Sequence, residues 1–136
     1  MTPEQTALAA EHAACYVYGV LAARTSQSDS PGLYGVLRSG FEHHRARRDR
    51  LTALIADAGQ TPVPAEPAYQ VPGRTGSPAG IRRAALTLER GCATTYAWLV
   101  AQTTGEDRRW AVEVLTETAL RELSLKGSPQ TLPGVD

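Results

Sequence analysis

Four side chains that could bind a metal ion or transfer a proton lie in apolar segments with helical periodicity: Glu11, His12, His44 and Glu89. Glu11 continues a row of three- and four-residue spacing that includes Leu8 and Cys15, so its carboxylate is expected to face the interior. His44 has the same relation to Leu37 and Leu51. Iron and manganese accept carboxylate and imidazole ligands. These residues are therefore the candidate ligands of a single, atypical metal site.

Arginine or histidine is a different partner for the inward carboxylates. A buried carboxylate without a partner is costly and takes up a proton instead. An arginine guanidinium stays charged and can bond both carboxylate oxygens. Residues 45–50, with the sequence RARRDR, bring several such groups close to His44. We therefore predict a core charge network of Glu11, Glu89, Arg45 and Arg48, in which arginine does what a metal would otherwise do.

The same arginines permit two other interpretations. They could form a solvated helix face, because Asp49 and Glu42 offset their charge. They could also line a pocket for a small anionic ligand or for the acidic surface of an unidentified protein partner, in which case Arg47 and Arg48 would hold the anion. The sequence leaves these alternatives open.

Length and composition indicate one globular domain. The 136 residues carry 14 basic and 14 acidic side chains, and 42% of them are hydrophobic, which suits a single domain with a stable core. Because the net charge is zero, neither nucleic acid nor an anionic membrane is an expected partner. Residues 1–4 lack the pattern of a secretory signal, and no apolar run could cross a bilayer. A cytoplasmic protein is expected, and the preference for Arg over Lys is typical of an actinobacterial genome.

The sequence offers little support for enzymatic catalysis. Cys15 and Cys92 lie in apolar helical patterns without the spacing of a redox or metal motif, so buried thiols are expected rather than a disulfide. No nucleophile stands beside a base with an orienting partner. The histidines are accordingly expected to be structural.

Helix boundaries are marked clearly. Three helix starts share a hydroxyl N-cap followed by proline at the first helical position: Thr2-Pro3, Ser30-Pro31 and Ser77-Pro78. Three apolar rows are followed by a glycine: Gly59, Gly105 and Gly127. These signals predict four helices: residues 3–25, 31–58, 78–103 and 106–126.

Connection lengths predict the topology. Short links join the first helix to the second and the third to the fourth, so each pair should form an antiparallel hairpin. Residues 59–77 are instead rich in proline, and an extended chain of that length can run along the whole bundle. The fold class predicted is all-α, a four-helix bundle of two antiparallel hairpins joined by a long Pro-rich crossover. Residues 127–136 are expected to form a flexible tail.

The order of the helices and the segments that carry their acidic residues resemble the ferritin-like superfamily, and within it small actinobacterial domains of unknown function. The resemblance rests on four segments: residues 10–14 (AEHAA), 42–49 (EHHRARRD), 88–92 (LERGC) and 113–122. It implies a ferritin-like four-helix bundle. In di-iron members, two helices each supply one glutamate and the other two each supply a Glu-x-x-His pair.

This chain departs from that metal pattern. No acidic residue is followed three positions later by histidine, and the position three before His44 is Phe41. Glu113 and Glu117 are both candidates for the acidic position of the fourth helix, and the sequence does not decide between them. We therefore expect a degenerate di-iron site, no cofactor, and a non-catalytic structural or interaction module. The alternative is a protein that binds iron or manganese through atypical ligands, or an oxidoreductase built on them.

Aromatic residues indicate a partner surface. Trp98 lies off the apolar row of the third helix, and Trp110 lies off that of the fourth. A helix that is apolar around much of its circumference is either central or covered by a partner. A homodimer that buries Trp98 or Trp110 is the expected assembly.

Overall fold

The computed structural model describes residues 1–135, and these form four α-helices with no strand among them. The helices are α1 (Pro3–Ala23), α2 (Pro31–Asp57), α3 (Pro78–Gln102) and α4 (Gly105–Ser124). The expectation of an all-α fold is confirmed. Hydroxyl groups cap two of the starts: the backbone N–H of Gln5 donates to Thr2 Oγ1 over 3.2 Å, and that of Gly80 donates to Ser77 Oγ over 3.1 Å. Ser30 precedes α2 without a side-chain cap bond.

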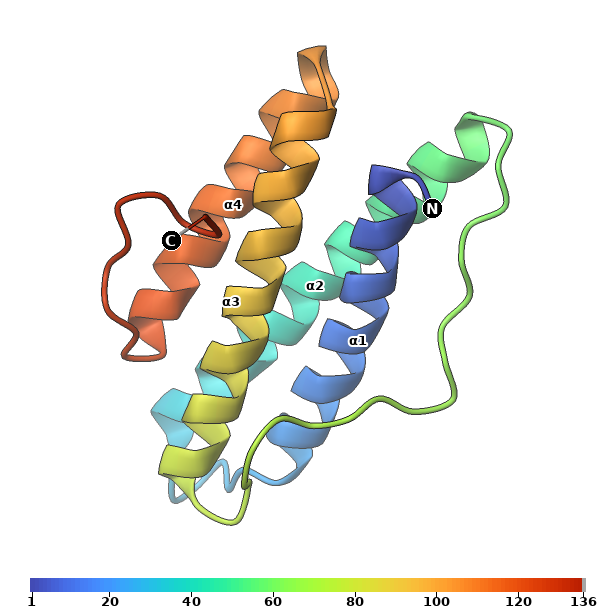
Figure 1. Ribbon diagram of the computed structural model, residues 1–136. Coiled ribbons are helices and arrows are strands. Elements are labelled where there is room, and N and C mark those ends of the chain that lie inside the picture. The colour runs from blue at the N-terminus through green and yellow to red at the C-terminus, as the bar shows by residue number, and fades with distance from the viewer. Residues whose placement is uncertain (136) are drawn as a thin grey trace.

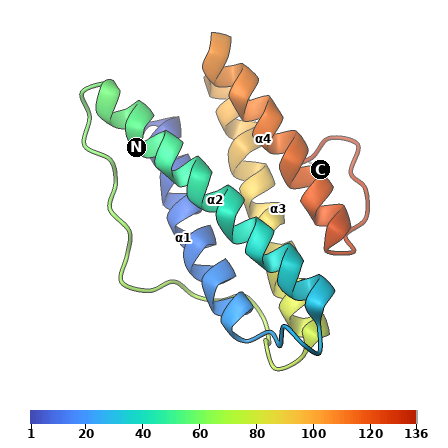
Figure 2. The ribbon, with the colours of Figure 1, turned by 180° about the vertical axis from the view of Figure 1, so that it is seen from behind.

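The helices pack as two antiparallel hairpins, α1 with α2 and α3 with α4 (Figure 1). The hairpins meet chiefly through α1 and α3, whereas α2 and α4 have almost no close backbone approach. Figure 2 shows α2 and α4 together on the opposite face of the molecule. Two adjoining cavities of about 260 and about 570 Å³ lie along this α2–α4 seam, and both are lined by His43 and Glu117.

The long crossover runs along the outside of the bundle, from the end of α2 to the start of α3 (Figures 1 and 2). The side chain of Gln5 ties it to α1: its Nε2 donates to the carbonyl of Thr61 over 2.7 Å, and its Oε1 accepts from the N–H of Val63 over 2.8 Å. At its other end Arg24 donates to the hydroxyl of Thr75. The crossover is thus bonded to α1 at both ends.

Residues after α4 return along the bundle (Figure 1). Gly134 adopts a positive φ of 78° and lies so close to α3 that a Cβ there would be 2.1 Å from the carbonyl oxygen of Ala93. Only glycine permits both this backbone conformation and this approach. Residues 127–135 therefore lie against the bundle, residue 136 lies outside the described residues, and the flexibility of the tail stays a prediction.

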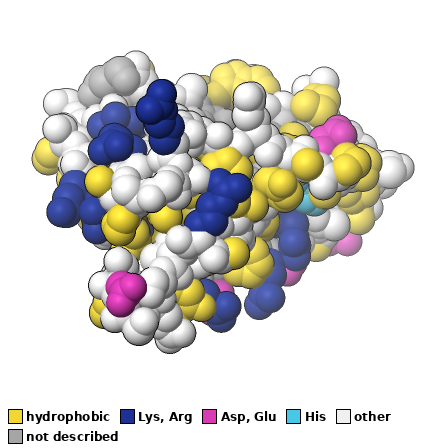
Figure 3. Space-filling view, turned by 90° about the horizontal axis from the view of Figure 1, so that it is seen from below, with side chains coloured by type: hydrophobic (Ala, Val, Ile, Leu, Met, Phe, Trp, Pro, Cys, Tyr) yellow, Lys and Arg dark blue, Asp and Glu magenta, His cyan; other side chains and the backbone are white. Residues whose placement is uncertain are grey.

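The apolar core consists of two clusters, one toward each end of the bundle. One cluster is centred on Val17, Leu21, Leu37 and Ile81, and the other on Leu8, Leu51, Ile55 and Leu99. Between them lies a layer of buried polar side chains. No helix within residues 1–135 has the length and apolar character needed to span a membrane. Seen from the end with the α1–α2 connection, basic side chains are spread among apolar ones rather than gathered in one patch (Figure 3).

Candidate functional site

Five buried side chains form a continuous hydrogen-bonded chain across the polar layer. Tyr96 Oη donates to Glu11 Oε1 over 2.6 Å, and Glu11 Oε2 lies 2.5 Å from His44 Nδ1. His44 Nε2 lies 2.8 Å from Glu89 Oε1, which also accepts from Tyr18 Oη over 2.5 Å. None of the five has a measurable exposed fraction. We refer to Tyr18, Glu89, His44, Glu11 and Tyr96 as the core network.

Helix geometry explains how the core network is assembled. Glu11 and Tyr18 on α1 are separated by the same number of residues as Glu89 and Tyr96 on α3, and this spacing places each pair on one helix face. Because α1 and α3 run in opposite directions, each glutamate meets the tyrosine of the other helix. His44 enters from α2 between the two carboxylates. The Glu-x6-Tyr spacing occurs in both helices, and this repeat is the sequence signal that pairs each tyrosine with a glutamate; neither tyrosine is among the site residues predicted above from the sequence.

Both ring nitrogens of His44 face carboxylate oxygens, so both must carry a proton to complete the two bonds. Burial opposes the charge, but the Glu11 and Glu89 carboxylates outweigh it and raise the pKa of His44 to about 9. Burial also acts against ionisation of Glu89, yet the bonds from His44 and Tyr18 hold its pKa below the usual value. Near neutral pH the network therefore contains an imidazolium between two carboxylates.

The tyrosines complete the network as proton donors. Burial and the neighbouring carboxylates raise the pKa values of Tyr18 and Tyr96 well above that of a free phenol. Burial and the same carboxylates raise the pKa of the Cys92 thiol. These groups stay protonated near neutral pH, which leaves the glutamates as the only anions of the network.

Arginine does reach the polar layer, but from other positions than the predicted ones. Arg45 is exposed over the ring of Phe41, and Arg48 bonds Asp49 on its own helix over 2.8 Å. The structure therefore does not bring Arg45 or Arg48 to Glu11 and Glu89. Arg47, three residues after His44 and on the same helix face, is the one that is buried.

Arg47 and Arg121 connect α2 and the core network to α4. Arg47 donates to Glu117 Oε2 over 2.9 Å and to Thr118 Oγ1 over 3.4 Å. The guanidinium of Arg121, on α4, lies 3.5 Å from Glu89 Oε1 and contacts His43. Since two carboxylates and one imidazolium leave a net negative charge, these guanidinium groups bring the layer close to neutrality.

The remaining sequence candidates lie outside the core network. His12 contacts the carbonyl of Val63 over 3.0 Å and so helps to fix the crossover. Glu113 and Glu117 are both exposed, and the buried glutamate of α4 is instead Glu122. Trp98 is 41% exposed. Trp110 is half-buried, edge-on to Tyr96, and covered by the guanidinium of Arg50 at 4.7 Å.

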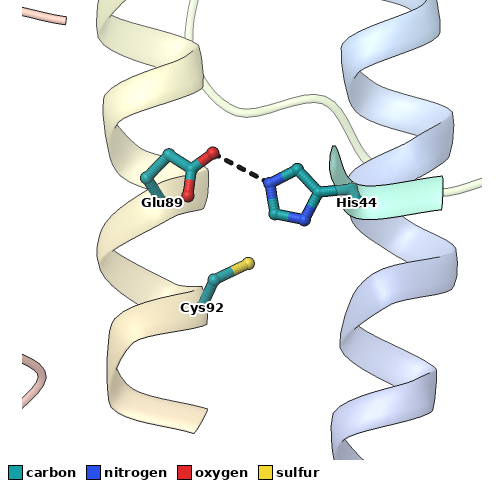
Figure 4. Close-up of side chains that lie close together, drawn as sticks. All are labelled: His44, Glu89 and Cys92. Carbon is teal, nitrogen blue, oxygen red and sulfur yellow. Dashed lines mark hydrogen bonds and ion pairs between the residues drawn. The ribbon is translucent and has the colours of Figure 1, made fainter. Parts of the chain in front are cut away.

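A metal could reach one group of ligand atoms in this layer. Atoms of His44, Glu89 and Cys92 lie within 4.8 Å of one another (Figure 4). Glu89 Oε2 is buried and has no hydrogen-bond partner. A metal there would need a neutral imidazole and a thiolate, whereas His44 bonds carboxylates through both nitrogens and the pKa of Cys92 is raised. A dinuclear centre does not fit these residues, because guanidinium groups from α2 and α4 occupy the layer.

Gly40 on α2 provides room for the core network. A Cβ at this position would lie 2.4 Å from the Tyr18 ring. We expect Gly40→Ala to lower the free energy of unfolding by about 1–3 kcal/mol, because the ring must move away from Glu89 or strain α2. Gly35→Ala is the matched control on the same helix, since its Cβ would meet nothing within 4 Å. Urea unfolding should show this control to be neutral or stabilised, and equal behaviour of the two variants would contradict the packing described.

The fold and the site define a class of all-helical proteins with a buried carboxylate–imidazole layer and no recognisable catalytic constellation among the described residues. Comparison with family models places the chain more narrowly. It belongs to the family described as "Domain of unknown function (DUF4439)", whose model matches residues 4–136.

A solved structure supports this placement. The chain is similar to a conserved hypothetical protein, rv2844, from Mycobacterium tuberculosis, an actinobacterium, with 31% sequence identity and a TM-score of 0.83. The match covers 91% of this chain and 85% of that protein. A comparison with curated proteins gave no match.

Proposed function

We propose that this protein is a ferritin-like bundle without catalytic activity, in which the imidazolium of His44 takes the place of a metal, and that it acts in the cytoplasm as a structural or interaction module. The observation that carries the proposal is the pair of hydrogen bonds that His44 makes, because each of its two ring nitrogens bonds a buried carboxylate from a different helix. This arrangement satisfies the charges that a metal would otherwise balance. No metal or other cofactor is needed to explain the layer.

Two surfaces support a role in binding. The α2–α4 seam is open and is lined by Arg47, Arg50 and Arg121, and by Glu117, which accepts a bond from Arg47. Trp98 and Leu120 are large apolar side chains that remain 41% and 60% exposed. Exposed apolar side chains of this size are typical of interfaces. We propose that the protein forms a homodimer through the Trp98 side of α3, because Trp110 already has Arg50 and Tyr96 as partners.

The experiment for this proposal combines metal analysis with a mass measurement. Protein purified without chelator is expected to hold far less than one equivalent of iron, manganese or zinc. In light scattering it is expected to have the mass of a dimer, and Trp98→Ser should shift it to a monomer while Val112→Ser, on another exposed position, should not. A monomeric wild-type protein would contradict the proposed assembly.

A second candidate function is binding of a single metal ion by His44, Glu89 and Cys92. The free Oε2 of Glu89 favours it, because this buried atom lacks a partner. Stoichiometric metal that Cys92→Ala removes, and that Cys15→Ala on α1 leaves in place, would establish this candidate and overturn the first. Metal binding here would also release the extra proton of His44, so uptake should rise with pH.

A further inference from the structure

A second buried carboxylate lies outside the core network. Glu122, in the last turn of α4, is 3% exposed, and its Oε1 has no hydrogen-bond partner among residues 1–135. Buried carboxylate oxygens in folded proteins are nearly always bonded, because desolvating them otherwise costs free energy. Burial raises the pKa of Glu122, and the nearby charge of Arg90 lowers it only in part. Glu122 therefore has a cation in its surroundings but no ion pair among the described residues.

A second oxygen without a partner lies in the same place. The buried Oε1 of Gln130, in the segment that follows α4, has no hydrogen-bond donor either. Glu122, Gln130 and Ser128 line one pocket of about 140 Å³, formed where this segment returns against α4. The pocket lies at the carboxyl end of the helix, where the backbone carbonyls add negative potential. Buried oxygen acceptors of both residues thus lie beside the pocket, which favours a positively charged donor there.

The rest of the pocket is apolar except for Thr116, whose hydroxyl already donates to the carbonyl of Val112. Ala119, Leu120, Leu123 and Pro129 form the apolar wall. An ammonium group has three N–H donors and one charge, which matches the three acceptors here: Glu122 Oε1, Gln130 Oε1 and the Ser128 hydroxyl. A hydrocarbon stem would lie against the leucines. We propose that this pocket binds a primary alkylammonium group, with Glu122 as its counter-ion and Gln130 and Ser128 as further acceptors.

Other ligand chemistries fit less well. A hard divalent cation favours several charged oxygen ligands, and this pocket has one carboxylate and an apolar half. A guanidinium group favours two parallel carboxylate bonds, whereas only Oε1 of Glu122 is buried without a partner. An anion would face the Glu122 carboxylate, whose charge repels it. The primary alkylammonium group is the chemistry that remains, and it could come from a lysine side chain of another molecule or from a free alkylamine.

The test is a nuclear magnetic resonance titration of the full chain at pH 8 with n-butylammonium chloride. We expect saturable shifts of the Gln130 side-chain amide and the Ser128 backbone amide. Tetramethylammonium, which has no N–H donor, and Ca²⁺ should bind at least tenfold more weakly. Absence of saturable shifts with n-butylammonium, or equal binding of any of the three cations, would overturn the proposal.

Three variants and a second ligand sharpen the test. Glu122→Gln keeps the shape and should weaken binding at least tenfold, whereas Glu113→Gln, exposed on the same helix, should leave it unchanged. Gln130→Glu adds a negative charge and should strengthen binding at least threefold. Weaker binding by this variant would mean that the amide N–H of Gln130 donates to Glu122, which would overturn the proposal. Nα-acetyl-lysine methylamide distinguishes the sources: binding comparable to n-butylammonium indicates a lysine side chain, and selective n-butylammonium binding indicates a free amine.

Discussion

Replacing His44 with leucine is expected to lower the free energy of unfolding by about 3–5 kcal/mol, the usual cost of removing one partner from a buried ion pair. The substitution leaves the Glu11 and Glu89 carboxylates facing each other in the core without a cation between them. Their charges would then be relieved only by taking up a proton or by opening the bundle. Urea unfolding followed by circular dichroism measures the change.

The matched control is the neighbouring residue. His43→Leu changes the same chemistry at an exposed position, where only the contact with Arg121 is lost, and should alter stability by less than about 1 kcal/mol. Adding Glu11→Gln and Glu89→Gln to His44→Leu should recover part of the loss, because it removes the unpaired charges. If His44→Leu does not fold, His44→Gln serves in its place. A cost below about 1 kcal/mol in either His44 variant would mean that the imidazolium is not what balances the two carboxylates.

Stability is expected to fall as the pH rises from about 6.5 to about 9. The folded pKa of His44, about 9, is above its ordinary value of 6.5. The protonated imidazole of His44 therefore contributes its full amount to the free energy of unfolding below pH 6.5. This contribution is lost as the pH rises through 9. The difference between these pKa values corresponds to roughly 3 kcal/mol.

Glu89 sets the acid side of the profile. Its folded pKa is below the ordinary value of 4.5, so its contribution is present above pH 4.5 and is lost at lower pH. Thermal unfolding between pH 4 and pH 9.5 should therefore show a maximum between about 4.5 and about 6.5. His44→Gln provides the comparison, because subtracting its profile removes the ionisation of the thiols and phenols. A wild-type profile parallel to that of His44→Gln across pH 6.5–9 would show that His44 is neutral in the folded protein.

Local signals in the sequence were enough to predict the helices. Pro3, Pro31 and Pro78 each start a helix where the preceding hydroxyl residue indicated it. The apolar rows also placed Glu11 and His44 inward, and both are fully buried. Caps and periodicity act within a few residues, so the chain carries this information locally.

Local signals in the sequence do not predict which side chains bond the site residues. Arg45, Arg47 and Arg48 all lie within one turn of His44, and only side-chain bonds to Glu117 and Thr118 on α4 distinguish Arg47 as the buried one. Tyr96 reaches Glu11, and Arg121 reaches Glu89, from helices distant in sequence. The burial of Glu122 depends on how the segment after α4 returns, and no local pattern encodes that.

The polar layer also fixes how the two hairpins align. The apolar clusters above and below it contain interchangeable aliphatic side chains, and such surfaces could pack almost equally well after one hairpin slid by a helical turn. A slide would press Glu11 and Glu89 against leucine and separate them from Tyr96, Tyr18 and His44. The layer thus penalises the wrong register more than it stabilises the right one, as a single buried polar position does in a coiled coil. The core network therefore specifies the register in which the four helices pack.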